Sequence, residues 1–284
     1  MNNINQFISI IIPVFNEGES IGYLLDEVLN VMHNNNLNCE LIVVNDGSHD
    51  NTSTVLDELI IKIKELSVIS LRKNYGQTAA MAAGFDNSSG EIVITLDGDL
   101  QNDPNDIPKL ISQINEGYDL ICGWRYVRKD KLINRRIPSK IANKLIANVT
   151  GLKLHDYGCS LKAFKKEILD DIKLYGELHR FLPVLANIEG AKIKEIKVNH
   201  RSRKYGSSKY GIDRTFRVLM DLLTVWFMTK FLTRPMYGFG FVGIVSILIS
   251  LGMTSYLFII KILGEDIGNR PMLMFALILG IAGV

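Results

Sequence analysis

The sequence predicts an α/β fold in which a mostly parallel sheet carries helices on both faces. Over roughly the first 200 residues, short runs rich in β-branched residues alternate with segments of helical periodicity. These runs are apolar throughout, which is typical of parallel strands buried on both faces. Strands that alternate with helices in this way are joined by right-handed crossovers, so we expect one open sheet.

The first half of the chain is predicted to supply four strands and the helices between them. The strands are expected at 7–14, ended by Pro13, and at 40–45, 68–71 and 92–96. An acidic helix start at 16–20 opens a helix to about Met32, and Asp50 to Thr52 can cap a helix to about Glu65. A helix rich in small residues, 76–85, then returns the chain to the strand at 92–96.

The elements continue to about residue 200. Asp103 followed by Pro104 predicts a helix start, and that helix should run to about Glu116. A short strand is expected at 118–122, with the segment 123–126 after it. Further helices are expected at 139–149 and up to about Ile188, and the alternating segment 192–199 predicts a strand with one wet face.

Composition narrows the class of protein. The chain has 284 residues, of which 47% are hydrophobic, and this is ample for one large or two small domains. A formal net charge of +2 gives no reason to expect a nucleic-acid partner. Cys39, Cys122 and Cys159 are odd in number and lack metal-ligand spacing, so reduced thiols in a cytosolic domain are expected. We also expect no cleavable signal peptide, because 7–14 is too short for its apolar core.

Polar side chains follow the buried strand at 92–96. Asp97, Asp99 and Gln101 would lie beyond its carboxyl end, which is where open parallel sheets bind ligands. Their alternating oxygens suit Mg²⁺ or Mn²⁺ held by few protein ligands and completed by phosphate oxygens. An ordinary Asp-Gly turn is the alternative interpretation.

Three motifs at strand ends carry a family resemblance. They are SIIIPVFNE at 9–17, VNDGS at 44–48 and LDGDLQ at 96–101. Their order and spacing resemble the inverting family 2 glycosyltransferases, whose catalytic domain has the GT-A (Rossmann-like) fold. The resemblance implies a nucleotide-sugar donor whose nucleoside pocket is lined by Pro13, Phe15 and Glu17.

The same resemblance assigns further donor contacts. Asp46 would accept a hydrogen bond from the base, and Asp97, Asp99 and Gln101 would surround a metal on the donor diphosphate. Glu17 and Asp46 could instead serve only as helix-start charge and turn cap.

Basic residues indicate the acceptor. The segments 123–126 and 200–210 resemble the subfamily that transfers sugars to polyprenyl phosphates, including dolichyl-phosphate mannose synthases and bacterial undecaprenyl-phosphate glycosyltransferases. A lipid phosphate explains these cations, whereas a sugar hydroxyl would not need them. Arg128, Lys129 and Lys131 are interpreted as a solvated face. The expected ligands of the acceptor phosphate are Arg125, Arg135, Arg136, Ser139, Arg201 and Lys209.

Asp156 matches an aspartate that recurs in this subfamily near the reacting centre; a turn aspartate is the alternative. Asp156, Arg125 and Asp99 are therefore the expected catalytic residues. His155 and His179 are interpreted as a loop and a helix-start residue, because neither has a second histidine at ligand spacing.

The last quarter of the chain indicates a membrane. Residues 211–234, separate from the catalytic domain at 1–210, mix aromatic residues with charges and are expected to form interfacial amphipathic helices; a core helix is the alternative. In the transmembrane region 235–284, the 25 uncharged residues 236–260 are long enough to span at about 1.5 Å per residue. Residues 271–284 are too short, so a truncated second span is expected. Lys230, Arg234 and the basic loops place the catalytic domain on the cytoplasmic side of a multi-pass protein of the inner membrane.

The predicted function is transfer of one sugar, with inversion, from a nucleotide-sugar to a polyprenyl phosphate. The resemblance implies UDP as the nucleotide, because bacterial members with a two-helix tail mostly use UDP whereas the dolichol branch uses GDP, and it implies that a tetramer can form. Two alternatives stay open: a processive polysaccharide synthase, although its Gln-x-x-Arg-Trp signature is absent from the sequence, and a catalytically silent sugar-nucleotide-binding membrane scaffold. The identity of the sugar does not follow from the sequence.

Overall fold

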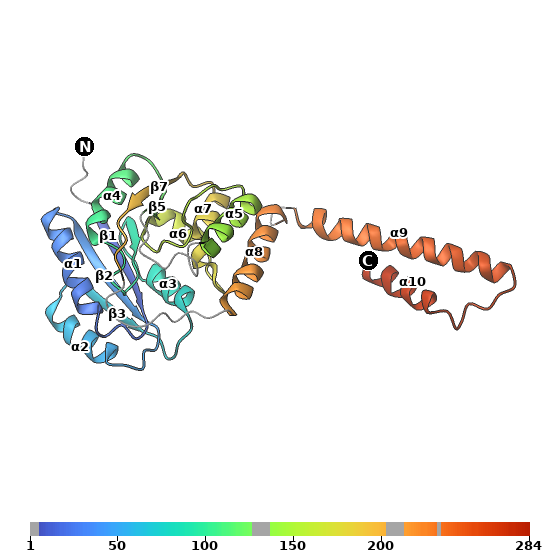
Figure 1. Ribbon diagram of the computed structural model, residues 1–284, viewed down its shortest axis with the longest axis horizontal. Helices are drawn as coiled ribbons and strands as arrows, with labels where there is room; N and C mark the ends of the chain where they lie inside the picture. The colour runs from blue at the N-terminus through green and yellow to red at the C-terminus, as the bar shows by residue number, and fades with distance from the viewer. Residues whose placement is uncertain (1–5, 127–136, 203–212, 232–233) are drawn as a thin grey trace. The chain divides into compact units, whose positions relative to one another are not determined.

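A seven-stranded sheet forms the core of the first part of the chain (Figure 1). The structure is a computed structural model that describes residues 6–126, 137–202, 213–231 and 234–284. The strands lie in the order β3-β2-β1-β4-β6-β5-β7. Their bounds are β1 Phe7–Val14, β2 Asn38–Asn45, β3 Leu66–Ser70, β4 Ile92–Thr95, β5 Leu120–Arg125, β6 Lys162–Lys165 and β7 Ile193–Val198.

Helices cover both faces of the sheet. Their bounds are α1 Ile21–Asn34, α2 Thr52–Lys62, α3 Gln77–Asp86, η1 Pro104–Asp106, α4 Ile107–Asn115, α5 Ile137–Thr150, α6 Lys166–Asp171, η3 Leu178–Phe181 and α7 Leu182–Ile188. One apolar core joins α1, α2 and α4 to one face, and a second joins α3, α6 and α7 to the other.

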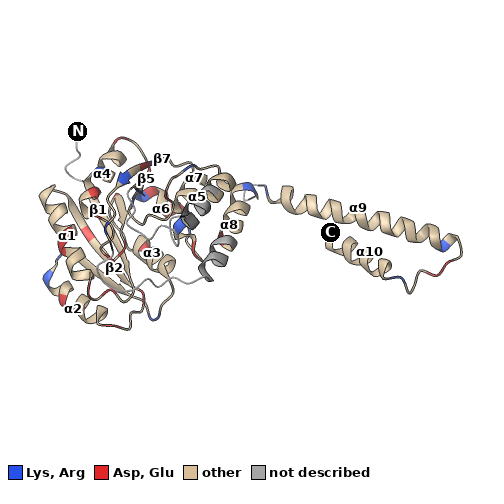
Figure 2. Cartoon of the chain, in the orientation of Figure 1, with Lys and Arg blue, Asp and Glu red and all other residues tan. Residues whose placement is uncertain are grey.

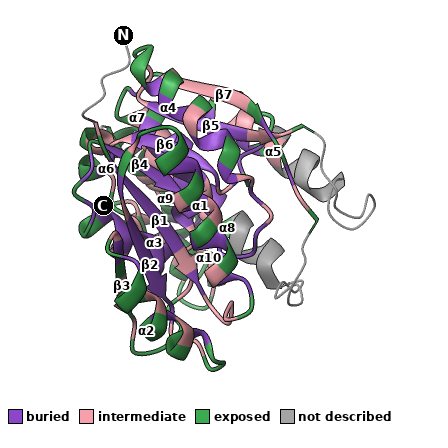
Figure 3. Cartoon of the chain, turned by 90° about the vertical axis from the view of Figure 1, so that its left-hand side faces the viewer, coloured by how far each residue is buried: buried purple, intermediate pink, exposed green. Residues whose placement is uncertain are grey.

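The strand β1 shows why the sheet is buried on both sides. Ile10 and Ile12 belong to the first core, whereas Ile11 between them belongs to the second, and all three are fully buried. Successive side chains of a strand point to opposite faces, so an uninterrupted apolar run supplies both cores. Figure 3 shows this interior in purple, with exposed residues mainly on the helices and turns. The predicted mostly parallel sheet with helices on both faces is confirmed.

The sequence did not predict β6, and this strand departs from the parallel direction of the others. This strand lies between β4 and β5 and runs antiparallel to both, with Thr95 opposite Lys162. The bounds of β1 agree with the predicted strand at 7–14, which includes Pro13. The strand predicted at 118–122 differs, because β5 extends through Arg125, where it pairs with Val198 of β7. The segment 123–126 is therefore mostly strand.

The C-terminal helices are α8 Asp213–Phe231, α9 Pro235–Ile262 and α10 Pro271–Ala282. The chain divides into two compact units, 1–225 and 226–284. Within the described residues, α9 is the helix long and apolar enough to cross a membrane, with a mean hydropathy of 2.1 and 11% of its apolar window buried. Figure 2 shows α9 and α10 almost free of charge along their lengths, with charges gathered in the turn that connects them.

Small residues bring α9 and α10 together as a hairpin. The Ser250 hydroxyl donates to the carbonyl of Ala276 at 2.7 Å. A Cβ on Gly243 would lie 2.7 Å from the carbonyl oxygen of Gly283, so the two backbones touch there without side chains between them. Close approach at small residues is the usual way in which apolar helices associate in lipid.

Candidate active site

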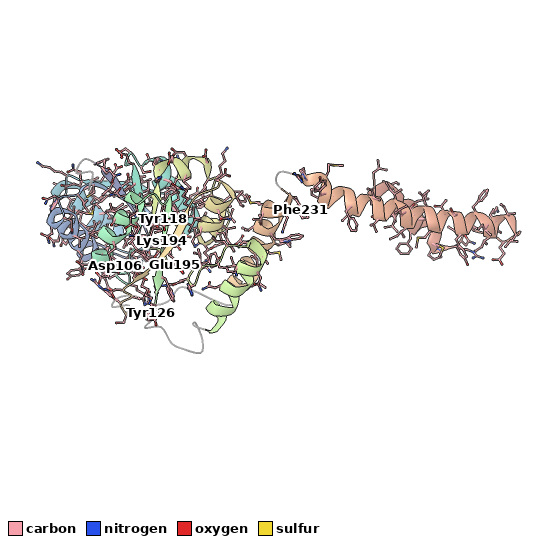
Figure 4. The ribbon with its side chains drawn as sticks, turned by 90° about the horizontal axis from the view of Figure 1, so that it is seen from above. Asp106, Tyr118, Tyr126, Lys194, Glu195 and Phe231 are labelled. Carbon is pink, nitrogen blue, oxygen red and sulfur yellow. The ribbon has the colours of Figure 1, made fainter. Side chains whose placement is uncertain are left out.

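The predicted site residues gather at one edge of the sheet. The parallel strands β1, β2, β4 and β5 end there, and the antiparallel strand β6 begins there. Figure 4 shows Tyr118 and Tyr126 at opposite ends of β5, with Lys194 and Glu195 of β7 between them; Tyr126 marks the edge of the site. Open α/β sheets bind ligands at this edge.

Hydrogen bonds from backbone amides to side-chain oxygens join the residues of the first motif to those of the second. The Asn16 amide donates to the hydroxyl of Ser48 at 2.9 Å, and the His49 amide donates to the Asn16 side-chain oxygen at 2.8 Å. Asn16 has a φ of 52°, a left-handed conformation that asparagine tolerates better than most residues. Phe15 contacts the His49 ring edge to face at 6.0 Å. The residues after β1 and after β2 therefore form one wall.

Glu17 is connected to the loop that follows β4. The hydroxyl of Ser20 lies 2.9 Å from a carboxylate oxygen of Glu17 and 2.9 Å from the carbonyl oxygen of Gly98. A Cβ on Gly98 would approach Val14 to 2.8 Å, so this position leaves no room for a side chain. Ser20 thus joins the first motif to the Asp-Gly-Asp segment, a contact that sequence reasoning missed.

Asp46 is engaged by the chain itself. Its carboxylate accepts from the amides of Tyr75 at 2.7 Å and Gly76 at 2.9 Å. Burial raises the pKa of this carboxyl above its ordinary value, although the two amides act in the opposite direction. Asp46 therefore fixes the loop before α3, and its expected contact to a nucleotide base stays a prediction.

The Asp-Gly-Asp segment forms a tight turn after β4. The side-chain amide of Gln77 donates to Asp97 at 2.8 Å, and the backbone amide of Gln101 donates to the Asp99 carboxylate at 3.1 Å. Leu100 between them has a φ of 61°, an uncommon conformation for a branched residue. Its side chain is 4% exposed and packs in the first core, which holds the turn in place.

The chemistry of this turn fits a hard divalent cation. Burial raises the pKa of Asp97, and the negative charge of Asp99 raises it further. Two carboxylates that repel each other in a partly buried site are the arrangement that a bound cation relieves. Within the described part of the chain, no group of three His, Cys, Asp or Glu side chains is placed to hold a metal. A hard cation at this turn would take its remaining ligands from water and from the oxygens of a bound phosphate group.

Arg125 and Asp156 form a bidentate ion pair. The Arg125 Nε lies 2.7 Å from Asp156 Oδ2, and its Nη2 lies 2.9 Å from Oδ1. Burial alone would lower the pKa of Arg125, but the hydrogen bonds and charge of Asp156 raise it above its ordinary value. Asp156 also accepts from the Gly158 amide at 3.2 Å, and its own amide donates to Glu195 at 2.8 Å. Two of the three expected catalytic residues are thus direct partners.

The remaining acceptor residues are only partly described. Arg135, Arg136 and Lys209 lie outside the described residues, and for Ser139 only the backbone, in α5, is described. Arg201 is described, and its guanidinium binds Glu27 at 2.6 Å and Asp103 at 2.8 Å. It would have to leave these carboxylates to reach a phosphate.

Sequence reasoning missed three polar residues at this edge. Ser20 was visible only as part of a helix start, and Gln77 as the first residue of an apolar helix. Lys162 opens β6 and is 3% exposed, with its ammonium donating to the carbonyl of Cys159. A lysine normally indicates a solvated position, so nothing in the sequence pattern predicted its burial.

Comparison with known proteins agrees with this geometry. Residues 9–173 match the family described as Glycosyl transferase family 2, which is more than half of the chain. The chain belongs to this family. As a family 2 glycosyltransferase, it carries the three motifs of the sequence analysis at the ends of β1, β2 and β4.

Two relatives match the whole length of this glycosyltransferase. The dodecaprenyl-phosphate galacturonate synthase of Rhizobium johnstonii is 45% identical over 287 residues, covering 98% of this chain and 83% of the relative. The undecaprenyl-phosphate 4-deoxy-4-formamido-L-arabinose transferase of Aeromonas hydrophila is 36% identical over 290 residues, covering 100% and 86%.

Among solved structures, glucosyl-3-phosphoglycerate synthase of Mycobacterium tuberculosis has the same fold. Its complex with Mn²⁺ and UDP-glucose superimposes with a TM-score of 0.61 at 18% identity, covering 79% of each chain. At this identity the likeness concerns the fold alone.

Proposed function

We propose that this protein transfers one sugar from a nucleotide-sugar to a polyprenyl phosphate, with inversion at the anomeric carbon. The observation that carries the proposal is the 45% identity, over 98% of the chain, to a dodecaprenyl-phosphate galacturonate synthase. The second relative also acts on a polyprenyl phosphate, according to its name. Each name gives one sugar and one lipid phosphate and no polysaccharide, which favours this function over a polysaccharide synthase or a silent scaffold.

The donor is expected to lie over the ends of β1, β2 and β4. Pro13, Phe15 and Glu17 would line the nucleoside pocket, and Asp97, Asp99 and Gln101 would hold Mg²⁺ or Mn²⁺ with the diphosphate. When bound, the cation supplies charge stabilisation for the leaving nucleoside diphosphate. We propose UDP as the nucleotide.

The acceptor phosphate is already anionic near neutral pH, so it needs positioning more than deprotonation. One of its oxygens forms the new bond to the anomeric carbon while the bond from that carbon to the donor diphosphate breaks. Arg125 could orient the phosphate through Nη1, because Asp156 holds its Nε and Nη2 and so fixes the direction of the guanidinium. Asp156 then acts through Arg125 as a positioning residue.

The sugar is proposed to be one of those in the relatives' names. Galacturonate comes first, since that relative is 45% identical against 36% for the formamido-arabinose transferase. The cytoplasmic placement of the catalytic unit at a bacterial inner membrane rests on α9 and on Lys230 and Arg234 at its start. Interfacial location of α8 and tetramer formation belong to the same proposal and stay predictions.

The experiment that tests the proposal is mass analysis of the lipid product. Purified full-length protein in detergent is incubated with undecaprenyl phosphate, Mn²⁺ or Mg²⁺ and UDP-galacturonate, with the UDP-formamido-arabinose donor in parallel. We expect one lipid product heavier by one sugar, with inverted anomeric configuration. A ladder of products would indicate a polymerase instead, and absence of any glycosylated lipid with either donor would contradict the proposed sugars.

A further inference from the structure

The segment Asn199–Arg201 after β7 is bound to the segment Gln101–Asp106 after β4. The Arg201 amide donates to the carbonyl of Gln101 at 2.8 Å, and the Asn199 amide donates to a carboxylate oxygen of Asp106 at 2.7 Å. Asn102 and His200 form an isolated antiparallel bridge between these contacts. The two segments therefore meet along their backbones, although about a hundred residues separate them in the chain.

The Arg201 guanidinium closes this contact from outside. Nη1 lies 2.6 Å from Glu27 of α1, and Nη2 lies 2.8 Å from Asp103, the residue that caps η1. Asp103 is the more buried partner, with 14% of its side chain exposed against 39% for Glu27. Two forked bonds to two carboxylates use the planar geometry that distinguishes arginine from lysine.

What this contact holds is the strained turn of the metal segment. Leu100, with its φ of 61°, lies directly before Gln101, whose carbonyl receives the Arg201 amide. A non-glycine residue in that conformation persists only where its surroundings determine it. The core side of the turn is fixed by the buried Leu100 side chain, and the outer side by Arg201.

We infer that Arg201 is a positioning residue for the metal and donor segment, held in place by Glu27 and Asp103, rather than a ligand of the acceptor phosphate. This inference rests on the proposed function, because it assigns Asp99 and Gln101 to the donor side. Arg201 supports their backbone without touching the reacting atoms.

Glu27→Gln is the variant that separates the two roles. It weakens the contact between Glu27 and Arg201 and leaves the positive charge of Arg201 unchanged. If Arg201 bound the acceptor phosphate, that binding would be unchanged or improved. Arg201→Lys keeps the positive charge but cannot bind Glu27 and Asp103 through two separate nitrogen atoms. Glu116→Gln is the matched control, since Glu116 is a surface carboxylate paired with Lys194 at 3.7 Å, away from the site.

Two measurements need no turnover. Calorimetry of Mn²⁺ with UDP should show about tenfold weaker metal binding for Glu27→Gln and Arg201→Lys, since outer residues that support ligands typically matter by roughly 10–100-fold. Hydrogen exchange should become faster in the peptide that contains the Arg201 amide. The control should change neither, and melting temperatures should stay close to that of the wild type.

Steady-state kinetics then gives the third readout. We expect a raised Mn²⁺ requirement and donor KM with an unchanged KM for undecaprenyl phosphate. Unchanged Mn²⁺–UDP binding in both variants would overturn the inference, whatever happens to the lipid KM. Wild-type protein that binds no Mn²⁺–UDP would contradict the proposed function; hydrogen exchange would then still decide whether Arg201 and Glu27 hold the segment.

Discussion

At the residue scale, the two carboxylates after β4 are the centre of the proposed chemistry. Asp99 is 7% exposed and accepts a hydrogen bond from the Gln101 backbone amide, so its replacement removes both a negative charge and a contact that shapes the turn. Asp99→Ala should therefore abolish turnover, by at least about 10³-fold, even in excess Mn²⁺ or Mg²⁺. Nucleotide release measured across a metal titration checks this. If the variant regained activity at high metal concentration, Asp99 would strengthen metal binding without being essential for turnover.

The ion pair between Arg125 and Asp156 predicts a separate kinetic pattern. In Asp156→Asn the charged bidentate contact is lost, so Arg125 is no longer held in one direction. We expect kcat to fall by about 10²-fold and the lipid KM to rise, with Mn²⁺–UDP affinity unchanged.

Arg125→Lys is the companion variant and should show the same pattern. Equal lipid KM values in the wild type and in both variants would contradict a positioning role for Asp156. Complete loss of turnover in Asp156→Asn, with donor and lipid binding intact, would favour a direct chemical role.

The sequence could predict which residues lie at the site wherever a motif follows a predicted strand. Pro13, Glu17, Asp46, Asp97 and Asp99 all lie at one edge of the sheet because parallel strands bring their ends together. Partners could not be predicted in this way. That Arg125 meets Asp156 depends on β6 running antiparallel, which places 156–161 back at the edge where β5 ends.

At the element scale, the sequence predicts the apolar strands, including the four-residue β4, and misses β6. The strand β6 has four residues, Lys-Ala-Phe-Lys, with lysines at both ends, so it carries neither an apolar run nor a clear alternation. It is a strand because β4 and β5 leave a gap that its backbone fills with hydrogen bonds on both sides. Such tertiary context outweighs local propensity.

One contact between elements predicts a pH dependence of stability. The Thr78 hydroxyl on α3 lies 2.7 Å from Nδ1 of His179 on η3, and burial lowers the pKa of that histidine to about 3 from 6.5. The unfolded chain binds a proton between these pH values and the folded chain does not. Stability should therefore fall as the pH is lowered from about 6.5 towards 3, by about 1.4 kcal/mol per pH unit from this group.

His179→Gln is the variant that isolates this effect, because it keeps a polar side chain near Thr78 and removes the titration. Denaturant unfolding between pH 4.5 and 7 should give a shallower dependence on pH for the variant than for the wild type. All other groups are common to the two proteins, so their contributions cancel in the comparison. Equal slopes would mean that His179 is charged in the folded state or exposed.

At the scale of the whole molecule, the two compact units differ in how they expose apolar residues. The first buries its apolar residues in two cores, whereas α9 exposes large apolar side chains along its length, as a helix in lipid does. The boundary between the two compact units, at 225/226, falls within α8. The expected domain bounds 1–210, 211–234 and 235–284 stay predictions.

The charges that flank α9 predict the orientation of the protein in the membrane. Lys230 and Arg234 precede α9, which favours a cytoplasmic position for the unit at 1–225. In a bacterial host, protease should digest this unit in inside-out vesicles and leave it intact in spheroplasts. The reverse pattern would place the catalytic unit outside the cell and contradict the proposed membrane face.

The most direct test of the central claim is release of nucleotide from a donor panel with and without lipid. Purified full-length protein in detergent receives Mn²⁺ or Mg²⁺ and a series of UDP- and GDP-sugars, with undecaprenyl phosphate present or omitted. The proposed function predicts release that depends on the lipid and is confined to one donor, with UDP-galacturonate first. Absence of lipid-dependent release with every donor, from folded protein that binds UDP, would contradict it.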